Sequence, residues 1–253
     1  MKIAILGLGE AGRTIAADLI AAKIAVSGWD PAPQDLPEGL IFAASNAEAV
    51  AQADLILSIN LADVATEVAS EVLPTLTSKQ LYTEINTASP QTKRQVAQIL
   101  QSSNVQVADA ALMAPVPARG LQTPVFVSGP GAQRFEQLMS PLGMPVTVLD
   151  DQVGTAATYK LIRSIAYKGI AAVVVECLAA GEKLNLDDYA REQLLTILPN
   201  EGIIDRFMQG SRKHAVRRSR EMEAVAQLLA DIEVPAHTTT AAIKQLKLLS
   251  FRK

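Results

Sequence analysis

The chain has 253 residues, of which 49% are hydrophobic, 19% charged and 4% aromatic, and its formal net charge is −3. This composition excludes a disordered chain and predicts one large domain or two small ones. One cysteine and two histidines exclude an internal disulfide and a four-ligand zinc site, so we expect no metal. A weakly acidic chain with few aromatic residues lacks the basic surface that nucleic acids need, so we expect no nucleic-acid partner.

The sequence carries no recognisable signal for export or membrane insertion. The N-terminus reaches Gly7 after only four apolar residues, which is too short for the apolar core of a secretory signal. The most apolar stretch, residues 161–180, is interrupted by Arg163, Lys168 and Glu176, which favours a buried helix over a membrane span. We therefore expect a cytoplasmic protein without a membrane partner.

Residues 1–150 alternate short apolar runs with amphipathic segments. The runs predicted as strands are 2–6, 24–29, 54–59, 80–85, 105–108, 125–127 and 146–149. The segments predicted as helices are 10–22, 47–53, 62–73, 90–101 and 131–140, with Ser89 as one N-cap and either Ser45 or Asn46 as another. Apolar strands that alternate with helices predict an α/β, Rossmann-type domain, in which helices cover both faces of a parallel sheet.

The pattern changes after residue 150. No convincing strand follows, and helices are predicted over 152–181, 186–198, 203–208, 211–232 and 238–249. The chain is therefore predicted to continue, without a flexible linker, into an all-α domain over residues 151–253.

A glycine loop stands between the first predicted strand and the first predicted helix. It has the spacing G-x-G-x-x-G of a dinucleotide fingerprint. The first glycine permits the tight turn, the second lets the backbone approach a pyrophosphate, and the third lets the helix pack on the strand. The helix N-terminus then offers free N–H groups to the phosphates. The predicted cofactor contacts in this loop are Gly7, Leu8, Gly9, Glu10, Ala11 and Gly12.

Asp30 ends the second predicted strand and bears on the choice of dinucleotide. A carboxylate there accepts hydrogen bonds from ribose hydroxyls and repels a 2′-phosphate. Residues 24–78 contain no Lys or Arg, and Arg13 is the one cation near this site in the sequence. These charges favour NAD(H), with NADP(H) as the alternative. A turn-forming role of Asp30 before Pro31 is compatible with either.

The order of these features resembles the β-hydroxyacid dehydrogenase superfamily, which includes 6-phosphogluconate and 3-hydroxyisobutyrate dehydrogenases and the imine reductases. Residues 5–12 (ILGLGEAG) resemble its cofactor signature, and residues 84–90 (EINTASP) resemble its strand end near the nicotinamide. Residues 109–116 (DAALMAPV) stand where the family has its substrate segment Asp-Ala-Pro-Val-Ser-Gly-Gly. Residues 154–160 (GTAATYK) resemble its glycine-then-lysine segment. The most similar branch is a short one whose C-terminal helical domain has no assigned function.

The resemblance implies roles for several residues. It implies that Lys160 is catalytic, that Asn60 and Asn86 contact the cofactor, and that Met113 contacts the substrate. It also implies a homodimer, which would cover the apolar surface of residues 170–180. The family's Ser-Gly-Gly is replaced by Met-Ala-Pro, and the asparagines after the catalytic lysine are replaced by Arg and Ser, so no particular substrate is assigned.

Lys160, Ser164 and Lys168 share one stripe of the long predicted helix. An ammonium in an apolar helix is costly to desolvate without a partner, and burial would suit it to acid–base work. Hydride transfer to a carbonyl needs such a proton donor. Periodicity alone favours a solvated helix edge, whereas the resemblance favours catalysis by Lys160. For Ser164 and Lys168 both a substrate-binding role and a surface role stay open.

A basic stretch covers residues 206–220. It has one aromatic residue, which is too few for a nucleic-acid surface. On a helical wheel Arg218 falls within the apolar face and His214 falls at its margin. Arg218 therefore needs an anion, either a substrate carboxylate or an internal glutamate such as Glu176. His214 is a candidate substrate contact with a structural role as its alternative.

The predicted function is an NAD(P)-dependent oxidoreductase. It would transfer a hydride between nicotinamide and a small, anionic hydroxy acid or carbonyl compound, with Lys160 as general acid and base. Two alternatives stay open, an imine reductase and a non-catalytic NAD(P)-binding module.

Overall fold

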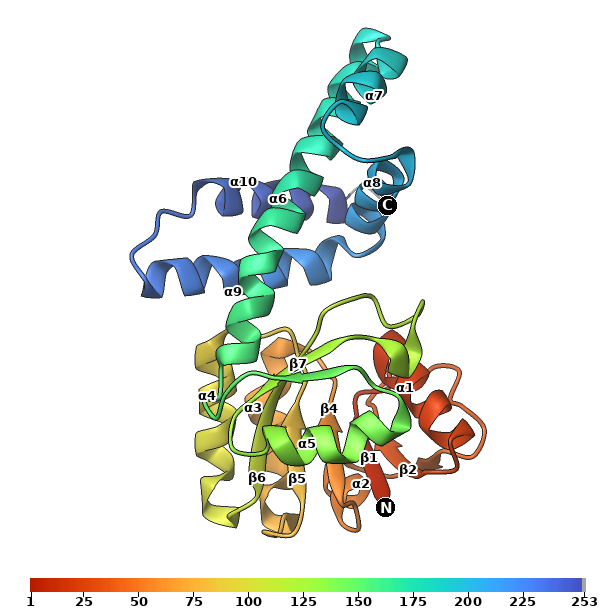
Figure 1. Ribbon diagram of the computed structural model, residues 1–253, viewed down its shortest axis with the longest axis vertical. Coiled ribbons are helices and arrows are strands. Elements are labelled where there is room, and N and C mark those ends of the chain that lie inside the picture. Colours follow the sequence, from red (N-terminus) through yellow and green to blue (C-terminus); the bar gives the residue numbers. More distant parts are fainter. Residues whose placement is uncertain (252–253) are drawn as a thin grey trace. The chain divides into compact units, whose positions relative to one another are not determined.

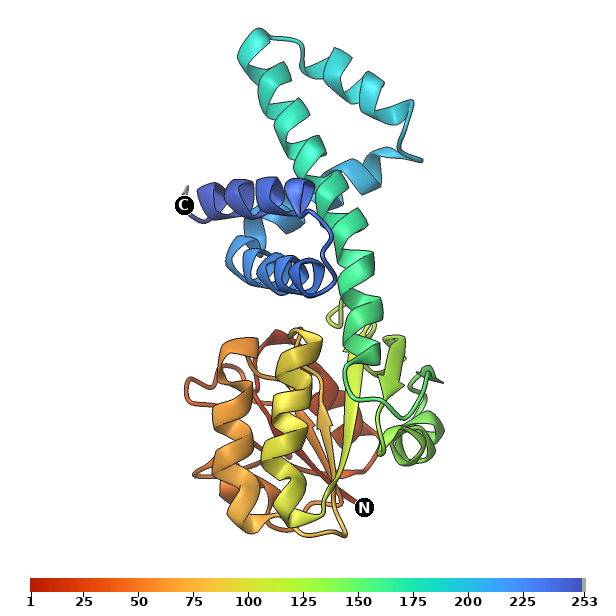
Figure 2. The same ribbon diagram turned by 90° about the vertical axis from the view of Figure 1, so that its left-hand side faces the viewer.

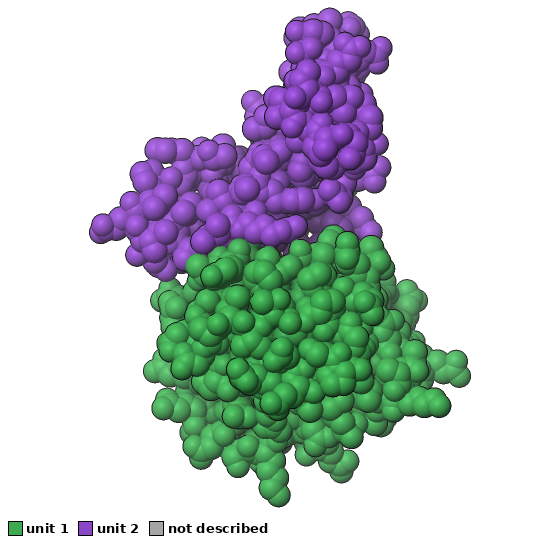
Figure 3. All heavy atoms as spheres, in the orientation of Figure 1, with its two compact units in different colours: residues 1–160 green, residues 161–253 purple. Residues whose placement is uncertain are grey.

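The computed structural model describes residues 1–251 (Figure 1). The chain divides into two compact units, one formed by Met1–Lys160 and one that begins at Leu161 (Figure 3). The first unit is an α/β domain and the second is all helical, so the predicted fold class is confirmed.

One eight-stranded sheet forms the centre of the first unit. Its strands are β1 (Lys2–Leu6), β2 (Ala25–Trp29), β3 (Ile41–Phe42), β4 (Leu55–Ser58), β5 (Leu81–Glu84), β6 (Gln106–Leu112), β7 (Val125–Ser128) and β8 (Val146–Val148). They lie in the order β3-β2-β1-β4-β5-β6-β7-β8. The longer helices of this unit are α1 (Glu10–Ala21), α2 (Asn46–Val50), α3 (Ala65–Val72), α4 (Pro90–Leu100) and α5 (Ala132–Met139).

Helices cover both faces of this sheet because successive side chains of a strand point to opposite faces. Ile3 and Ile5 of β1 pack in one apolar cluster with residues of α1 and α5. Ala4 and Leu6 pack in a second cluster with residues of α2, α3 and α4. Figure 2 shows α3 and α4 on one side of the sheet and α5 on the other. The strands are therefore apolar on both sides, as the sequence indicates.

Two details of the sheet differ from the sequence prediction. Strand β7 runs antiparallel to β6, because residues 113–124 between them contain only a short 3-10 turn and no crossover helix. Strand β3 was not predicted, since it has only two residues and both are exposed at the edge of the sheet. The predicted caps are present: Ser89 accepts a hydrogen bond from the N–H of Thr92, and Ser45 rather than Asn46 caps α2.

The order of strands reverses direction at β1, which lies between β2 and β4. In open α/β sheets, ligands bind outside the carboxyl ends of the strands at such a switch point. The residues that follow β1, β4 and β5 are the glycine loop, Asn60 and Asn86. All three segments therefore reach the same edge of the sheet.

The second unit is built on the long helix α6 (Thr155–Leu184), which begins in the first unit. The helices that follow are α7 (Asp187–Leu195), α8 (Glu201–Lys213), α9 (Ala215–Asp231) and α10 (His237–Ser250). The prediction of one helix over 211–232 is wrong at its start, because the chain leaves helical geometry at His214. The break lets the guanidinium of Arg218 pack against Gly210, where a Cβ atom would lie 2.3 Å from its Nη2.

Over residues 1–251, none of the helices combines the length and the apolar character that crossing a bilayer requires.

Candidate functional site

The glycine loop after β1 makes a tight turn that only glycine accommodates. Gly7 has φ +100°, and a Cβ atom there would lie 2.5 Å from the carbonyl oxygen of Ile59. At Gly12 a Cβ atom would lie 1.9 Å from the carbonyl oxygen of Gly7, so the start of α1 packs directly on the loop. These two glycines fix the close approach of β1, the loop and α1.

Gly9 differs from its two neighbouring glycines, because a Cβ atom there would meet nothing within 4 Å. Gly9 is exposed and is the N-cap residue of α1, so free space lies over the N–H groups that begin this helix. A pyrophosphate requires both features, an open approach to the backbone and the positive end of a helix dipole. The loop therefore fits the phosphates of a dinucleotide.

Asp30, at the end of β2, faces this loop. Its Oδ2 accepts a hydrogen bond from the N–H of Leu8 at 2.7 Å, and its Oδ1 accepts one from Ala32 at 2.9 Å. Each oxygen keeps acceptor capacity, because a carboxylate offers about four lone-pair sites. The turn role and the ligand role that the sequence suggested for Asp30 are thus compatible. Arg13 reaches the loop after β2 and pairs with Asp35 at 3.2 Å.

Two amide side chains lie at the carboxyl ends of β4 and β5. Asn86 is 4% exposed and donates from Nδ2 to Oδ1 of Asn60 at 2.7 Å. Asn60 in turn donates to Oγ of Ser58 at 3.0 Å. Oδ1 of Asn86 is buried without a hydrogen-bond partner from the described residues. A buried acceptor that lacks a donor is costly, and a carboxamide N–H of a bound nicotinamide would supply one.

Lys160 lies half-buried in the second turn of α6 and interacts with other residues of the protein. The first turn of this helix is fastened to the sheet. Oδ2 of Asp109, on β6, accepts hydrogen bonds from the N–H groups of Gly154 at 3.1 Å and Ala157 at 3.0 Å. Oγ of Ser128, on β7, accepts one from Ala156 at 3.0 Å.

The segment that resembles the family's substrate segment divides into two parts. Its first residue, Asp109, lies fully buried within β6 and anchors α6. Met113 follows β6, is half-buried, and donates its backbone N–H to the carbonyl oxygen of Pro124 at 2.8 Å. Only the part from Met113 onward lies beyond the strand, where a ligand could reach it.

A buried lysine that was not predicted from the sequence lies beside this site. Lys93 of α4 is 1% exposed, and its Nζ lies 3.1 Å from Oδ1 of Asp109 and 3.6 Å from Oε1 of Glu84. It also donates to the carbonyl oxygen of Glu84 at 2.7 Å. A signal was present, because Lys93 falls on the same face of α4 as the buried Val96 and Leu100.

Glu84 shares this buried environment with a second carboxylate. Burial raises the pKa of Glu84 above its ordinary value of 4.5, Lys93 opposes the rise, and the charge of Asp109 adds to it. Oε1 of Glu84 accepts the backbone N–H of Asn86 at 2.9 Å, while Oε2 is buried without a hydrogen-bond partner from the described residues.

Ser164 and Lys168 lie together inside the second unit, not on a solvated helix edge. Nζ of Lys168 donates to Oγ of Ser164 at 3.1 Å and forms an ion pair with Glu221 of α9. Ser164 also donates to Glu221. Desolvation lowers the pKa of Lys168, and Glu221 acts in the opposite direction. The stripe predicted from spacing therefore exists, with Glu221 as a partner that sequence reasoning did not identify.

Arg218 is half-buried and its Nη1 donates to Oγ of Ser211 at 3.0 Å. Its guanidinium carbon lies 5.8 Å from the ring centre of Tyr167. Glu176, the internal partner that the sequence suggested, is exposed, and the carboxylate whose charge acts on Arg218 is Glu221. His214 is half-buried at the junction of α8 and α9, where it interacts with other residues.

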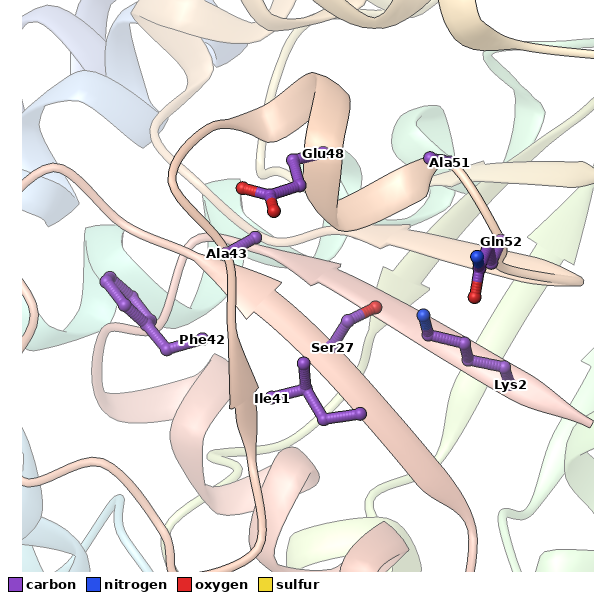
Figure 4. A pocket seen from close by; sticks show the side chains of 8 residues that line it. All are labelled: Lys2, Ser27, Ile41, Phe42, Ala43, Glu48, Ala51 and Gln52. Atoms are coloured by element: carbon purple, nitrogen blue, oxygen red, sulfur yellow. The ribbon is translucent and has the colours of Figure 1, made fainter.

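A surface pocket of about 240 Å³ lies elsewhere on the first unit (Figure 4). It is lined by Lys2, Ser27, Ile41, Phe42, Ala43, Glu48, Ala51 and Gln52. Lys2 begins β1, whereas the glycine loop follows the other end of that strand. The pocket is therefore separate from the predicted dinucleotide site.

The fold and the glycine loop define an NAD(P)-binding domain of the Rossmann type joined to a helical domain. Residues 2–149 match the family described as the NAD binding domain of 6-phosphogluconate dehydrogenase, and the chain belongs to this family. Residues 182–249 match a domain of unknown function, DUF1932. The family assigned from sequence, including its short branch with a helical domain of unassigned function, is confirmed.

Several known proteins are similar over most of the chain. An uncharacterised 28.5 kDa protein of Methanothermus fervidus is 25% identical over 233 residues, which are 88% of each chain. A probable 3-hydroxyisobutyrate dehydrogenase of Mycobacterium bovis is 24% identical over 77% of this chain and 68% of its own. The structure of a 3-hydroxyisobutyrate dehydrogenase from Salmonella typhimurium has the same fold, with a TM-score of 0.81, 18% identity and coverage of 98% and 93%.

Gly9→Ala tests whether the open space over α1 receives the cofactor. The added methyl meets no protein atom, so the free energy of unfolding should fall by less than about 1 kcal/mol, the scale of a lost N-cap preference. The methyl would stand where the pyrophosphate approaches, so the dissociation constant for NADH should rise roughly tenfold or more, about 1.4 kcal/mol. Fluorescence titration and urea unfolding measure the two quantities.

Gly202→Ala, at an exposed glycine of α8, is the matched control and should leave NADH binding unchanged. Wild-type affinity in Gly9→Ala would place the pyrophosphate elsewhere.

Glu84→Gln should alter how stability depends on pH. A carboxyl whose folded pKa is raised contributes stability below its ordinary value of 4.5 and loses it as pH rises through the folded pKa. Glutamine is neutral at every pH and keeps an acceptor for the N–H of Asn86. The free energy of unfolding of the variant, relative to wild type, should therefore increase between about pH 5 and about pH 8. Urea unfolding at both values measures it, and a constant difference would contradict the assignment.

Proposed function

We propose that the protein is an oxidoreductase that transfers a hydride between a nicotinamide dinucleotide and a small hydroxy acid or carbonyl compound. The observation that carries this proposal is that the candidate cofactor residues and the helix that bears Lys160 are attached to the same sheet. The glycine loop and Asn86 follow strands β1 and β5, and the first turn of the helix that bears Lys160 is hydrogen-bonded to β6 and β7. The family match and the similarity to hydroxyacid dehydrogenases agree with it.

The bound nicotinamide would supply or accept the hydride at its C4 atom. Lys160 would act on the substrate oxygen. As an ammonium, it would protonate the oxygen on which negative charge develops during reduction. As a neutral amine, it would take the hydroxyl proton during oxidation. Asn86 would hold the carboxamide of the nicotinamide through its buried Oδ1 atom.

We propose NAD(H) rather than NADP(H) as the preferred cofactor. The carboxylate of Asp30 accepts two hydrogen bonds from backbone N–H groups and can accept further ones from ribose hydroxyls. Its negative charge would repel a 2′-phosphate. Arg13, the cation that could pair with such a phosphate, is already paired with Asp35.

NADH should therefore bind more tightly than NADPH in a direct titration, and Asp30→Ala should reduce the difference between the two dissociation constants. Tighter binding of NADPH to the wild type would overturn the preference.

We propose an anionic substrate. The residues that the sequence suggested as its contacts are Met113, Ser164, Lys168, His214 and Arg218. Ser164 and Lys168 are 1% and 8% exposed and are bonded to Glu221, whereas Met113, His214 and Arg218 are half-buried. Arg218 donates to Ser211, lies beside Tyr167 and feels the charge of Glu221, and its guanidinium is a group that can bind a substrate carboxylate through two parallel hydrogen bonds.

We also propose that the protein is a homodimer. Three apolar side chains of α6, Ile162, Ile170 and Val173, are 58%, 45% and 61% exposed. Apolar area of this kind on the longest helix favours contact with a second copy of the chain. Sedimentation at micromolar concentration should show a dimer, and a monomer would contradict the proposal.

Lys160→Ala should abolish turnover, with kcat reduced by about 10²- to 10⁴-fold, the usual contribution of a general acid or base. The dissociation constant for NADH should be unchanged, because the lysine acts on the substrate. Turnover is measured as NADH or NADPH oxidation with panels of β-keto acids, aldehydes and cyclic imines.

Lys183→Ala, at an exposed lysine of the same helix, should keep wild-type kcat. Retained turnover in Lys160→Ala would remove this lysine from the mechanism. Turnover restricted to cyclic imines would favour an imine reductase. Tight NADH binding without turnover on any substrate would favour a binding module.

A further inference from the structure

Asp109 uses its two carboxylate oxygens for two different purposes. The side chain is fully buried on β6. Oδ1 lies 3.1 Å from the ammonium of Lys93. Oδ2 accepts the N–H groups of Gly154 and Ala157, at 3.1 Å and 3.0 Å. One side chain therefore joins a buried cation of α4 to the first turn of α6, three residues before Lys160.

The backbone before α6 is shaped for this contact. Gly154 has φ +108°, a conformation that side-chain-bearing residues rarely adopt, and a Cβ there would lie 3.1 Å from Pro90 and from Arg94 of α4. Ser128, which pairs with Asp109 across β6 and β7, accepts the N–H of Ala156. The first N–H groups of a helix have no partners within the helix, and here side chains of β6 and β7 supply the acceptors.

We propose that Asp109 is a positioning residue for Lys160 and that Lys93 is its counter-charge. This inference rests on the proposed role of Lys160 in proton transfer. Asp109 fixes the first turn of α6 against the sheet, and the lysine one turn later takes its place from that anchor. Lys93 also contacts the neighbouring part of the site, because its Nζ donates to the carbonyl oxygen of Glu84. Oε1 of Glu84 in turn accepts the backbone N–H of Asn86.

A carboxylate is required because Oδ1 faces the ammonium of Lys93 as an ion pair, without a hydrogen bond, while Oδ2 accepts the N–H groups of α6. An asparagine amide has one acceptor oxygen and one NH₂ group, which only donates. If the amide oxygen faces Lys93, the NH₂ group faces the N–H groups of α6. In the reverse orientation, the NH₂ group faces the ammonium of Lys93. Asp109→Asn therefore breaks one of the two contacts in either orientation. Removing the ammonium as well would free the amide oxygen for the helix.

The experiment compares Asp109→Asn with the double variant Lys93→Met/Asp109→Asn. In the single variant, the amides of Gly154 and Ala157 should exchange with solvent more than tenfold faster, as measured by NMR. We expect kcat to fall by roughly 10²-fold, the cost of a misplaced catalytic group, and the dissociation constant for NADH to stay unchanged. In the double variant, slow exchange of both amides should return.

The rescue separates positioning from a general contribution to stability, because the double variant loses still more of the buried charge network. Asp150→Asn is the matched control: it is exposed, it bonds the N–H of Gln152 at 2.9 Å, and it should leave both amides unchanged. Wild-type exchange in Asp109→Asn, or a double variant no better than the single one, would overturn the proposal.

Two further outcomes are also decisive. If Asp109→Asn does not fold, the double variant alone decides, with wild-type exchange at both amides expected and faster exchange overturning the proposal. If the wild type turns over none of the substrates, the function proposed for Lys160 has failed. The exchange rates and the pH titration of the Lys160 Cε resonance then still show whether Asp109 fixes the helix, and unaltered values in Asp109→Asn would overturn the proposal.

Discussion

The buried ammonium of Lys93 is the interaction on which the candidate site depends. It lies between the carboxylates of Asp109 and Glu84, where an unpaired charge would be strongly destabilising. Asp109 continues this network to the start of α6, and Glu84 continues it to Asn86. One cation thus lies beside both the carboxylate that anchors the helix bearing Lys160 and the side chain that accepts the backbone N–H of Asn86, the amide proposed for the nicotinamide.

The sheet supplies the frame for this network. Because β1, β4, β5 and β6 run parallel, their carboxyl ends meet at one edge, and the glycine loop, Asn60, Asn86 and Met113 all follow those ends. Gly7 and Gly12 bring the loop and α1 close enough for the N–H groups of the helix to serve a phosphate. The site is therefore a consequence of strand order as much as of its residues.

The second unit contains a polar core of a different kind. Lys168, Ser164 and Glu221 satisfy one another between α6 and α9, and Arg218 packs against Tyr167 and Gly210. Such a network favours one packing of the helices over others, because each buried polar group needs its own partner. The i, i+4 spacing that suggested a ligand-binding stripe also allows this internal arrangement.

The sequence by itself determined the fold class, which follows from local periodicity, and the glycine loop, which follows from the short-range spacing of glycines. It also indicated the family, through the resemblance of four short segments to the family's motifs. It also placed Lys160 and Asn86 on the correct elements. It could not identify Lys93, Asp109 and Glu84 as one cluster, nor pair Lys168 with Glu221, because those contacts join residues far apart in the chain. It likewise could not show that β7 is antiparallel. Only the tertiary structure decided these points, since the free energy of a buried charge depends on which partners the fold brings to it.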